Sequence, residues 1–316
     1  MAGIEIPKEK WSGKVREIVL GATAADGGTR SRTVTVGGET TLPFLKFEGD
    51  IPHTPALAVE VRDSHPTEWP SILVEAWNGA TQDAAAWAKA AEAAGADVVA
   101  LTFAASDKLD AAYARKTVRR VLSATGLPLI VFGTGQANLD NDILVAVAEE
   151  GKGERLLLGV CEDKNYRTIV AAALAHGHLV DARTAMDVNL AKQLNILMYD
   201  MGMPMERIMM DPTTGALGYG IEYGYSVMER LRLAALQGDS MTQQPMLVTP
   251  GEEAWRTKEA RAAEGVPAAW GEHAQRAVNW EVLTASLLVE SGADILILRH
   301  PQSLQRVRTM INALMS

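Results

Sequence analysis

Short, continuous runs of apolar residues recur along the chain between residues 56 and 299, and polar or glycine-containing segments separate them. These runs are apolar at successive positions rather than at alternate ones. They therefore predict strands buried on both faces, which is typical of a parallel sheet. The predicted strands are residues 56–61, 97–103, 127–133, 155–161, 178–182, 207–211, 245–250 and 294–299.

Amphipathic segments with the period of a helix alternate with these strands. The clearest are residues 83–94, 111–124, 140–151, 165–176, 188–202, 223–237, 272–291 and 303–315. Glycine stands where several of them should stop, as at Gly95, Gly177 and Gly292. Eight strand–helix units predict a (β/α)8 TIM barrel. A doubly wound open sheet is the alternative, but the first strand–helix connection lacks the GxGxxG pattern of dinucleotide-binding sheets.

Residues 1–55 do not follow this repeat. The segments 13–21 and 31–47 are rich in Val and Thr, and Gly37–Gly38 is a turn dipeptide, so they predict an N-terminal β-hairpin extension. The hairpin would either close one end of the barrel or extend its sheet. We therefore divide the chain into a hairpin extension and connector, residues 1–55, and a TIM barrel, residues 56–316.

Composition narrows the class of partner. The 316 residues carry a net charge of −9, which argues against nucleic acid or an anionic membrane surface as a partner. No apolar run approaches the roughly 18 residues of a membrane span, so we expect a cytoplasmic protein. With Cys161 as its one cysteine, this chain alone cannot hold an iron–sulfur cluster, a Cys-rich zinc site or a disulfide framework.

Polar residues follow the predicted strands, at the end of a TIM barrel that carries function. The loop after the sixth strand is the most polar and glycine-rich of them, and Gly215 would let its backbone approach a flat ligand closely. Asp211 could act there as a base, as a hydrogen-bond acceptor for a heterocycle, or as a helix N-cap. The hydrogen-bonding candidates after the fifth and sixth strands are Arg183, Thr184, Asn189, Asp211, Thr213, Thr214 and Gly215.

Catalytic machinery is scarce in the sequence. His176 and His178 lack metal-ligand spacing, no lysine stands inside a predicted strand to form a Schiff base, and no GxSxG motif is present. Residues 249–253, TPGEE, have one glycine followed by two carboxylates, which would repel a phosphate. We predict no catalytic residue and no metal ligand. Asp181, inside the fifth strand, is expected to pair with Arg183 or with a threonine.

Two long connections follow the first and seventh strands, at residues 63–82 and 251–271. Long loops at this face usually carry function or form an interface. Each contains two tryptophans, which either form a partner surface or pack the loop onto the barrel. These tryptophans are Trp69, Trp77, Trp255 and Trp270.

Four stretches carry a resemblance to a known family: PFLKFEG (43–49), PALAVEV (55–61), MDPTTGALGYGIEY (210–223) and NWEVLTASLLVESGADILILRHP (279–301). Together they resemble the small subunit of the corrinoid iron–sulfur protein, which is related to the delta subunit of acetyl-CoA decarbonylase/synthase. The resemblance extends over nearly the whole chain, and the DPTTGxxGYGxEY string is its most specific part.

The resemblance implies a TIM barrel that forms a heterodimer with a large subunit carrying a [4Fe–4S] cluster and a corrinoid-binding domain. The corrinoid would lie where the two subunits meet. Its Co(I) would accept a methyl group from methyltetrahydrofolate through a separate methyltransferase and pass it to acetyl-CoA synthase, in the acetyl-CoA (Wood–Ljungdahl) pathway. The chain would be a methyl-carrier subunit rather than an enzyme, because the cofactor carries the chemistry.

Under this resemblance, the seven hydrogen-bonding candidates at the fifth and sixth strand ends are expected to contact the corrinoid, in part through its amide side chains. Two other functions remain open. In a pterin-dependent methyltransferase barrel, Asp211, Asn138 and Asp63 would bind the pterin ring. An ordinary barrel aldolase or lyase is the third possibility.

Overall fold

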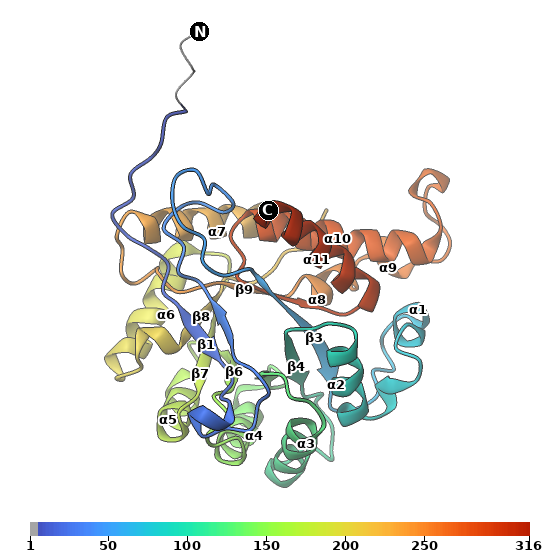
Figure 1. Ribbon diagram of the computed structural model, residues 1–316. Helices are drawn as coiled ribbons and strands as arrows, with labels where there is room; N and C mark the ends of the chain where they lie inside the picture. The colour runs from blue at the N-terminus through green and yellow to red at the C-terminus, as the bar shows by residue number, and fades with distance from the viewer. Residues whose placement is uncertain (1–5) are drawn as a thin grey trace.

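A computed structural model describes residues 6–316, and Figure 1 shows them as a ring of strands surrounded by helices. Eight parallel strands form one sheet in the order β8-β7-β6-β5-β4-β3-β10-β9. A bridge between Met210 and Met246 closes the sheet into a barrel. The strands are β3 (Ala56–Arg62), β4 (Val98–Thr102), β5 (Leu129–Phe132), β6 (Leu157–Cys161), β7 (Leu179–Arg183), β8 (Ile208–Asp211), β9 (Leu247–Val248) and β10 (Ile295–Leu298).

The helices pack against the outer face of the barrel, and the buried outward-facing residues of the strands form the main core with them. The predicted TIM barrel is therefore confirmed. Within residues 6–316 the longer helices are α2 (Ala84–Ala93), α3 (Ala111–Ala124), α4 (Ala137–Glu150), α5 (Tyr166–His176), α6 (Val188–Asp200), α7 (Ile221–Leu236), α10 (His273–Glu290) and α11 (Pro301–Met315).

Most element boundaries differ from the prediction by one or two residues, and the largest differences are at β9 and α4. Strand β9 has two residues rather than the six predicted at 245–250, because Pro250 occupies the first turn of the short helix α8 (Pro250–Ala254). Proline is favoured at that helical position and cannot donate a hydrogen bond within a sheet. Helix α4 starts at Ala137, three residues before the predicted start at residue 140.

The N-terminal hairpin closes one end of the barrel, the first of the two arrangements considered above. Strands β1 (Ile18–Leu20) and β2 (Val34–Val36) pair antiparallel, and Figure 1 shows β1 crossing in front of the barrel. Ile18, Leu20 and Val36 join the apolar cluster of the barrel interior. The prediction of β structure up to residue 47 is wrong, because the chain turns away from the pair at Gly37–Gly38, both with positive φ. The boundary at residue 55 stays a prediction.

Arg30 anchors this extension to the barrel. Its Nε donates to Glu154 at 2.8 Å, and its Nη1 donates to the carbonyl oxygen of Thr125 at 2.7 Å. Its Nη2 donates to the carbonyl oxygen of Leu122 at 2.7 Å. The buried guanidinium is thus satisfied by one charge and by carbonyls that precede β5, so the hairpin is held at the N-terminal end of the strands.

The two long connections contain short helices. α1 (Ser71–Glu75) and the 3₁₀ turn η2 (Ala80–Gln82) follow β3, whereas α8, α9 (Lys258–Arg261) and the 3₁₀ turn η4 (Ala268–Trp270) follow β9. Trp69, Trp77 and Trp255 are buried, so they pack these connections onto the barrel. Trp270 is 42% exposed, on a segment that projects from the barrel just before α10 on the right of Figure 1. Of these four tryptophans, Trp270 alone remains a candidate for a surface that contacts a partner.

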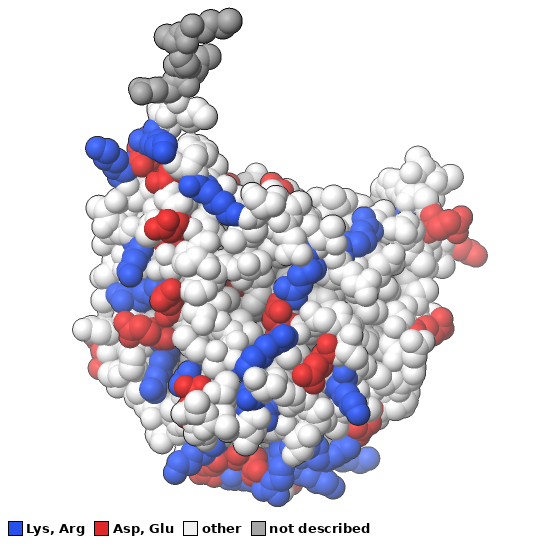
Figure 2. Space-filling view, viewed as in Figure 1, with Lys and Arg blue, Asp and Glu red and all other residues white. Residues whose placement is uncertain are grey.

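Figure 2 shows basic and acidic side chains interspersed over one face of the molecule. The densest group of both signs lies at the lower edge of this view, over α3 and α4. Ion pairs join these helices there, including Arg119 with Glu150 at 2.6 Å. Among residues 6–316, no helix combines the length and the apolar character needed to cross a bilayer.

The start of α6 offers a test of the local structure next to the barrel mouth. The Asp187 carboxylate accepts hydrogen bonds from the backbone N–H groups of Asn189 and Leu190, at 2.7 and 3.0 Å. We expect Asp187→Ala to lower the free energy of unfolding by about 1 kcal/mol, because two N-terminal amides lose their acceptor. Urea unfolding measures the change. Asp200→Ala, at the exposed far end of α6, is the control and should cause no comparable loss.

Candidate functional site

A cavity of about 450 Å³ opens at the carboxyl ends of the barrel strands, and we call it the mouth cavity. Phe132, Val160 and Ile297 are its apolar residues from within the barrel, whereas most of its other residues are polar. It therefore suits a ligand with several hydrogen-bonding groups. Its polar side chains are Glu60, Arg62, Thr102, Thr134, Arg183, Thr213, Thr214, Thr249, Glu252, Glu253 and Arg256.

A buried ion pair lies at this mouth. Arg183 at the end of β7 and Asp211 at the end of β8 are paired in register across the two strands. The Arg183 Nε donates to the Asp211 carboxylate at 2.6 Å. Burial raises the pKa of Asp211, and the Arg183 charge counteracts this. Its two oxygens accept from the Arg183 Nε and the Thr213 N–H, so the geometry favours the ionised form. The terminal nitrogens of Arg183 make no hydrogen bond to the described residues and could donate to a ligand.

The loop after β8 is held by the same pair. The Thr213 N–H donates to Asp211 Oδ1 at 2.9 Å, and the Thr213 hydroxyl donates to the carbonyl oxygen of Thr184. Thr213 has a φ of 59°, a left-handed conformation that is strained for a β-branched residue. Such strain is typically found at ligand-binding or catalytic sites. Asp211 is not an N-cap, because the next helix, α7, begins at Ile221.

Asp181 lies one inward-facing position below Arg183, and its expected pairing with Arg183 or a threonine is wrong. Neither carboxyl oxygen has a hydrogen-bond partner. Burial raises the pKa of Asp181 well above its usual value, and the negative charge of Asp211 adds to this effect. Burial therefore favours the neutral form of Asp181. A Cβ on Gly159 would lie 2.8 Å from the Asp181 Cβ and 2.9 Å from its carboxyl, so glycine leaves room for this group.

Neutrality of Asp181 can be tested by the pH dependence of stability. A carboxyl whose pKa is raised by folding stabilises the protein fully below its unfolded pKa of about 3.9, and this contribution is lost as pH rises through the folded pKa. We expect Asp181→Asn to remove that loss, so that its advantage over the wild type in unfolding free energy grows by up to about 1.4 kcal/mol per pH unit until the folded pKa is reached. Urea unfolding between pH 5 and 9 checks this. Parallel pH profiles for the two proteins would contradict it.

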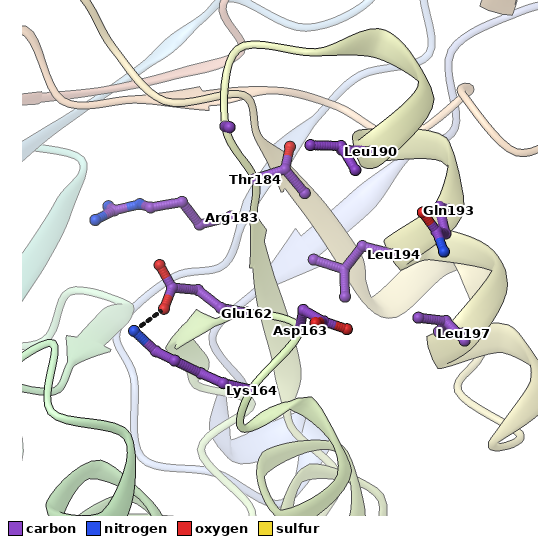
Figure 3. A pocket seen from close by; sticks show the side chains of 10 residues that line it. Glu162, Asp163, Lys164, Arg183, Thr184, Leu190, Gln193, Leu194 and Leu197 are labelled. Carbon is purple, nitrogen blue, oxygen red and sulfur yellow. Dashed lines mark ion pairs between the residues drawn. The ribbon is translucent and has the colours of Figure 1, made fainter.

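A second cavity of about 450 Å³, the side groove, lies between α6 and the segment after β6. Figure 3 shows three leucines of α6 on one side and the Glu162–Lys164 ion pair on the other. Arg183 lines both cavities, and in Figure 3 its guanidinium points away from the leucines. Thr184 also lines the groove, and its hydroxyl oxygen is buried without an acceptor or donor. The two cavities thus meet at Arg183.

The structure brings most of the seven predicted residues together. Arg183, Thr213 and Thr214 line the mouth cavity, Thr184 lines the side groove, and Asp211 accepts a hydrogen bond from Arg183 across the neighbouring strand. Gly215 and Asn189 line neither cavity. Gly215 is buried against the backbone of Gly220, where a Cβ would lie 2.6 Å from a carbonyl oxygen, and Asn189 is exposed on α6. The geometry gives no support to a ligand contact for these two.

Sequence reasoning missed the opposite wall of the mouth. Glu60 and Arg62 face the barrel interior near the end of β3, and Glu60 pairs with the buried Arg299 at 2.6 Å. Arg256 pairs with Glu252 at 2.7 Å and with Glu253 at 2.8 Å. The alternation of Glu60 and Arg62 at the end of an apolar strand was the available signal, since alternate residues share a face.

Metal-ligating groups and the three pterin-binding candidates do not gather at the mouth among residues 6–316. Among the described residues, no group of three or more His, Cys, Asp or Glu side chains is placed to hold a metal ion. The pterin-binding candidates do not converge. Asp63 accepts a hydrogen bond from the Ala104 N–H at 2.8 Å, and Asn138 is exposed on α4. Cys161 is fully buried, and burial raises the pKa of its thiol well above the usual value.

Fold and site together define a (β/α)8 barrel with a polar mouth suited to binding a ligand or a partner. The chain belongs to the CO dehydrogenase/acetyl-CoA synthase delta subunit family, whose profile matches residues 17–312. It is 37% identical to the acetyl-CoA decarbonylase/synthase complex subunit delta of Archaeoglobus fulgidus, over 99% of this chain and 71% of that protein. It is 38% identical to the Methanopyrus kandleri subunit, over 93% of this chain and 74% of that one.

Solved structures with a similar fold are dihydropteroate synthases. That of Stenotrophomonas maltophilia matches with a TM-score of 0.58 and 13% identity, over 83% of this chain and 94% of the other. That of Xanthomonas albilineans with 4-aminobenzoic acid matches with a TM-score of 0.57 and 15% identity, over the same shares. At this identity, the likeness establishes the TIM-barrel fold alone.

Proposed function

We propose that this chain is the small subunit of a heterodimeric corrinoid iron–sulfur methyl carrier and that its barrel mouth covers one face of the corrinoid. The large subunit would hold the [4Fe–4S] cluster and most of the corrinoid. When bound, the corrinoid supplies a nucleophilic Co(I) that accepts a methyl group from methyltetrahydrofolate, through a methyltransferase, and passes it to acetyl-CoA synthase. We place this assembly in the cytoplasm.

The observation that carries the proposal is the set of unused hydrogen-bonding groups that line the mouth cavity and the adjoining side groove of a barrel from this family. The terminal nitrogens of Arg183 are free of hydrogen bonds, and the Arg62 Nε and the Thr184 hydroxyl are buried without partners. A corrinoid carries carboxamide groups around its ring, and these both donate and accept hydrogen bonds. The donor set therefore fits the periphery of a corrinoid.

This chain's own residues would bind and shield rather than transfer protons. Thr213 and Thr214 face the mouth from a loop fixed by the buried Asp211, and Arg183 stands beside them. Phe132 and Val160 contribute apolar surface, which excludes water from the covered face. A cover of this kind needs no base or nucleophile, in keeping with a carrier subunit that is not itself an enzyme.

Methyl transfer from methyltetrahydrofolate to free cobalamin separates the carrier function from a pterin-dependent methyltransferase. We expect the purified chain alone to give no turnover above the protein-free reaction. A loaded heterodimer, supplied with the methyltransferase, should accept the methyl group. Robust turnover by the isolated chain would instead identify it as a methyltransferase. Native mass spectrometry of a cell extract should show the chain together with one larger subunit.

A further inference from the structure

Three arginines and three glutamates line the mouth cavity, but Arg183 is not paired with any of these glutamates. Arg62 and Arg256 pair with glutamates that also line the cavity, whereas Arg183 pairs with Asp211, which does not. The Arg183 side chain is 23% exposed and that of Asp211 is 1% exposed. Of this ion pair, the positive end therefore faces the cavity and the negative end lies beneath it.

A second carboxyl next to this pair does not cancel the effect. Asp181 is fully buried below Arg183 and makes no hydrogen bond, and burial, which raises its pKa, favours the neutral form of its carboxyl. The cluster of three side chains therefore carries one positive and one negative charge. Because Asp211 is buried and Arg183 is only partly exposed, the field of the pair toward the cavity is screened less than that of a pair on the open surface.

We propose that Arg183 tunes the reduction potential of the corrinoid covered by the barrel mouth, by favouring the cobalt state of lower positive charge. This inference rests on the proposed function. One-electron reduction of Co(II) to Co(I) removes one unit of positive charge from the cobalt. A guanidinium facing the cofactor stabilises the product relative to the reactant, so the reduced state forms at a less negative potential.

The prediction has a definite sign for each member of the cluster. Arg183→Met should lower the Co(I)/Co(II) ratio at a fixed potential about tenfold, a shift of about 59 mV for one electron. The shift has the same direction if Asp211 takes up a proton once Arg183 is replaced. Both charges are then lost, and the positive one was the charge facing the cavity. Asp211→Asn should shift the ratio the other way, since it leaves the cation without its counter-charge.

The experiment is a potentiometric titration of the corrinoid-loaded heterodimer with a low-potential chemical reductant, followed by the visible absorbance of the corrinoid. Arg183→Lys keeps the charge and should restore most of the wild-type potential. Asp181→Asn is the matched neutral control and should leave the potential unchanged. Corrinoid content and thermal unfolding of each variant establish that it is loaded and folded.

A wild-type potential in the loaded Arg183→Met heterodimer would overturn the proposal. Equal shifts in the Met and Lys variants would also overturn it, because they would assign the effect to packing rather than charge. Asp211→Asn provides an independent check, and a shift in the same direction as Arg183→Met would contradict the electrostatic account. If the wild-type chains fail to assemble or to load corrinoid, the proposed function itself is wrong.

Discussion

We expect the Asp211→Ala variant to lose about 3–5 kcal/mol of unfolding free energy, because the buried end of the Arg183 ion pair disappears. Arg183 loses a partner at 2.6 Å, and the Thr213 N–H loses its acceptor at 2.9 Å. The strained left-handed backbone of Thr213 is then no longer held by that hydrogen bond. Urea unfolding followed by circular dichroism measures the loss.

Asp211→Asn is the matched variant for this prediction. Its amide oxygen can still accept from the Thr213 N–H, so it should lose less than the alanine variant, and the difference reports the hydrogen bond. A loss below about 1 kcal/mol for Asp211→Ala, in the range of a surface ion pair, would show that this pair does not support the mouth.

Arg299→Met should destabilise the protein by a similar amount, about 3–5 kcal/mol, from the opposite wall of the mouth. The Arg299 Nε and Nη2 donate to the Glu60 carboxylate at 2.6 and 3.1 Å, and both side chains are buried. The guanidinium also lies 4.5 Å from the ring centre of Trp69. Loss of the guanidinium leaves the Glu60 carboxylate buried without this partner. It also loosens the connection after β3, which Trp69 packs onto the barrel. Thermal and urea unfolding both measure it.

Two controls separate the buried pair from charge in general. The double variant Glu60→Gln with Arg299→Met removes both charges and should recover part of the stability, because the Glu60 carboxylate is no longer buried without its Arg299 partner. Arg119→Met breaks an exposed ion pair between α3 and α4 and should have a much smaller effect. Equal losses for Arg299→Met and Arg119→Met would contradict the role assigned to the Glu60–Arg299 pair.

The barrel could be predicted because its strands are apolar at successive positions and its helices repeat regularly. Boundaries were less predictable, as at β9, where Pro250 belongs to a helix rather than to the strand before it. The tryptophans show a similar limit. Trp77 Nε1 donates to the carbonyl oxygen of Arg299, a partner 222 positions away, and nothing in the local sequence around Trp77 indicates it.

The location of the site could be predicted from the sequence, but the ion pair within it could not. Asp181 and Arg183 are two apart on one strand, so their side chains share a face but stand nearly 7 Å apart along it. Asp211 stands opposite Arg183 on the neighbouring strand, less than 5 Å away in the pairing direction. Strand register therefore decides which carboxylate meets the guanidinium. A prediction that included the register of β7 and β8 would have found this pair.

The central claim is that the barrel mouth covers the corrinoid, and amide hydrogen exchange tests it most directly. The heterodimer would be compared with and without corrinoid, so that contact between the subunits is the same in both samples. The account predicts slower exchange at residues 183–184 and 213–214 in the loaded heterodimer, with no change at the hairpin end of the barrel. Unchanged exchange at the mouth, with protection confined to the large subunit, would contradict it.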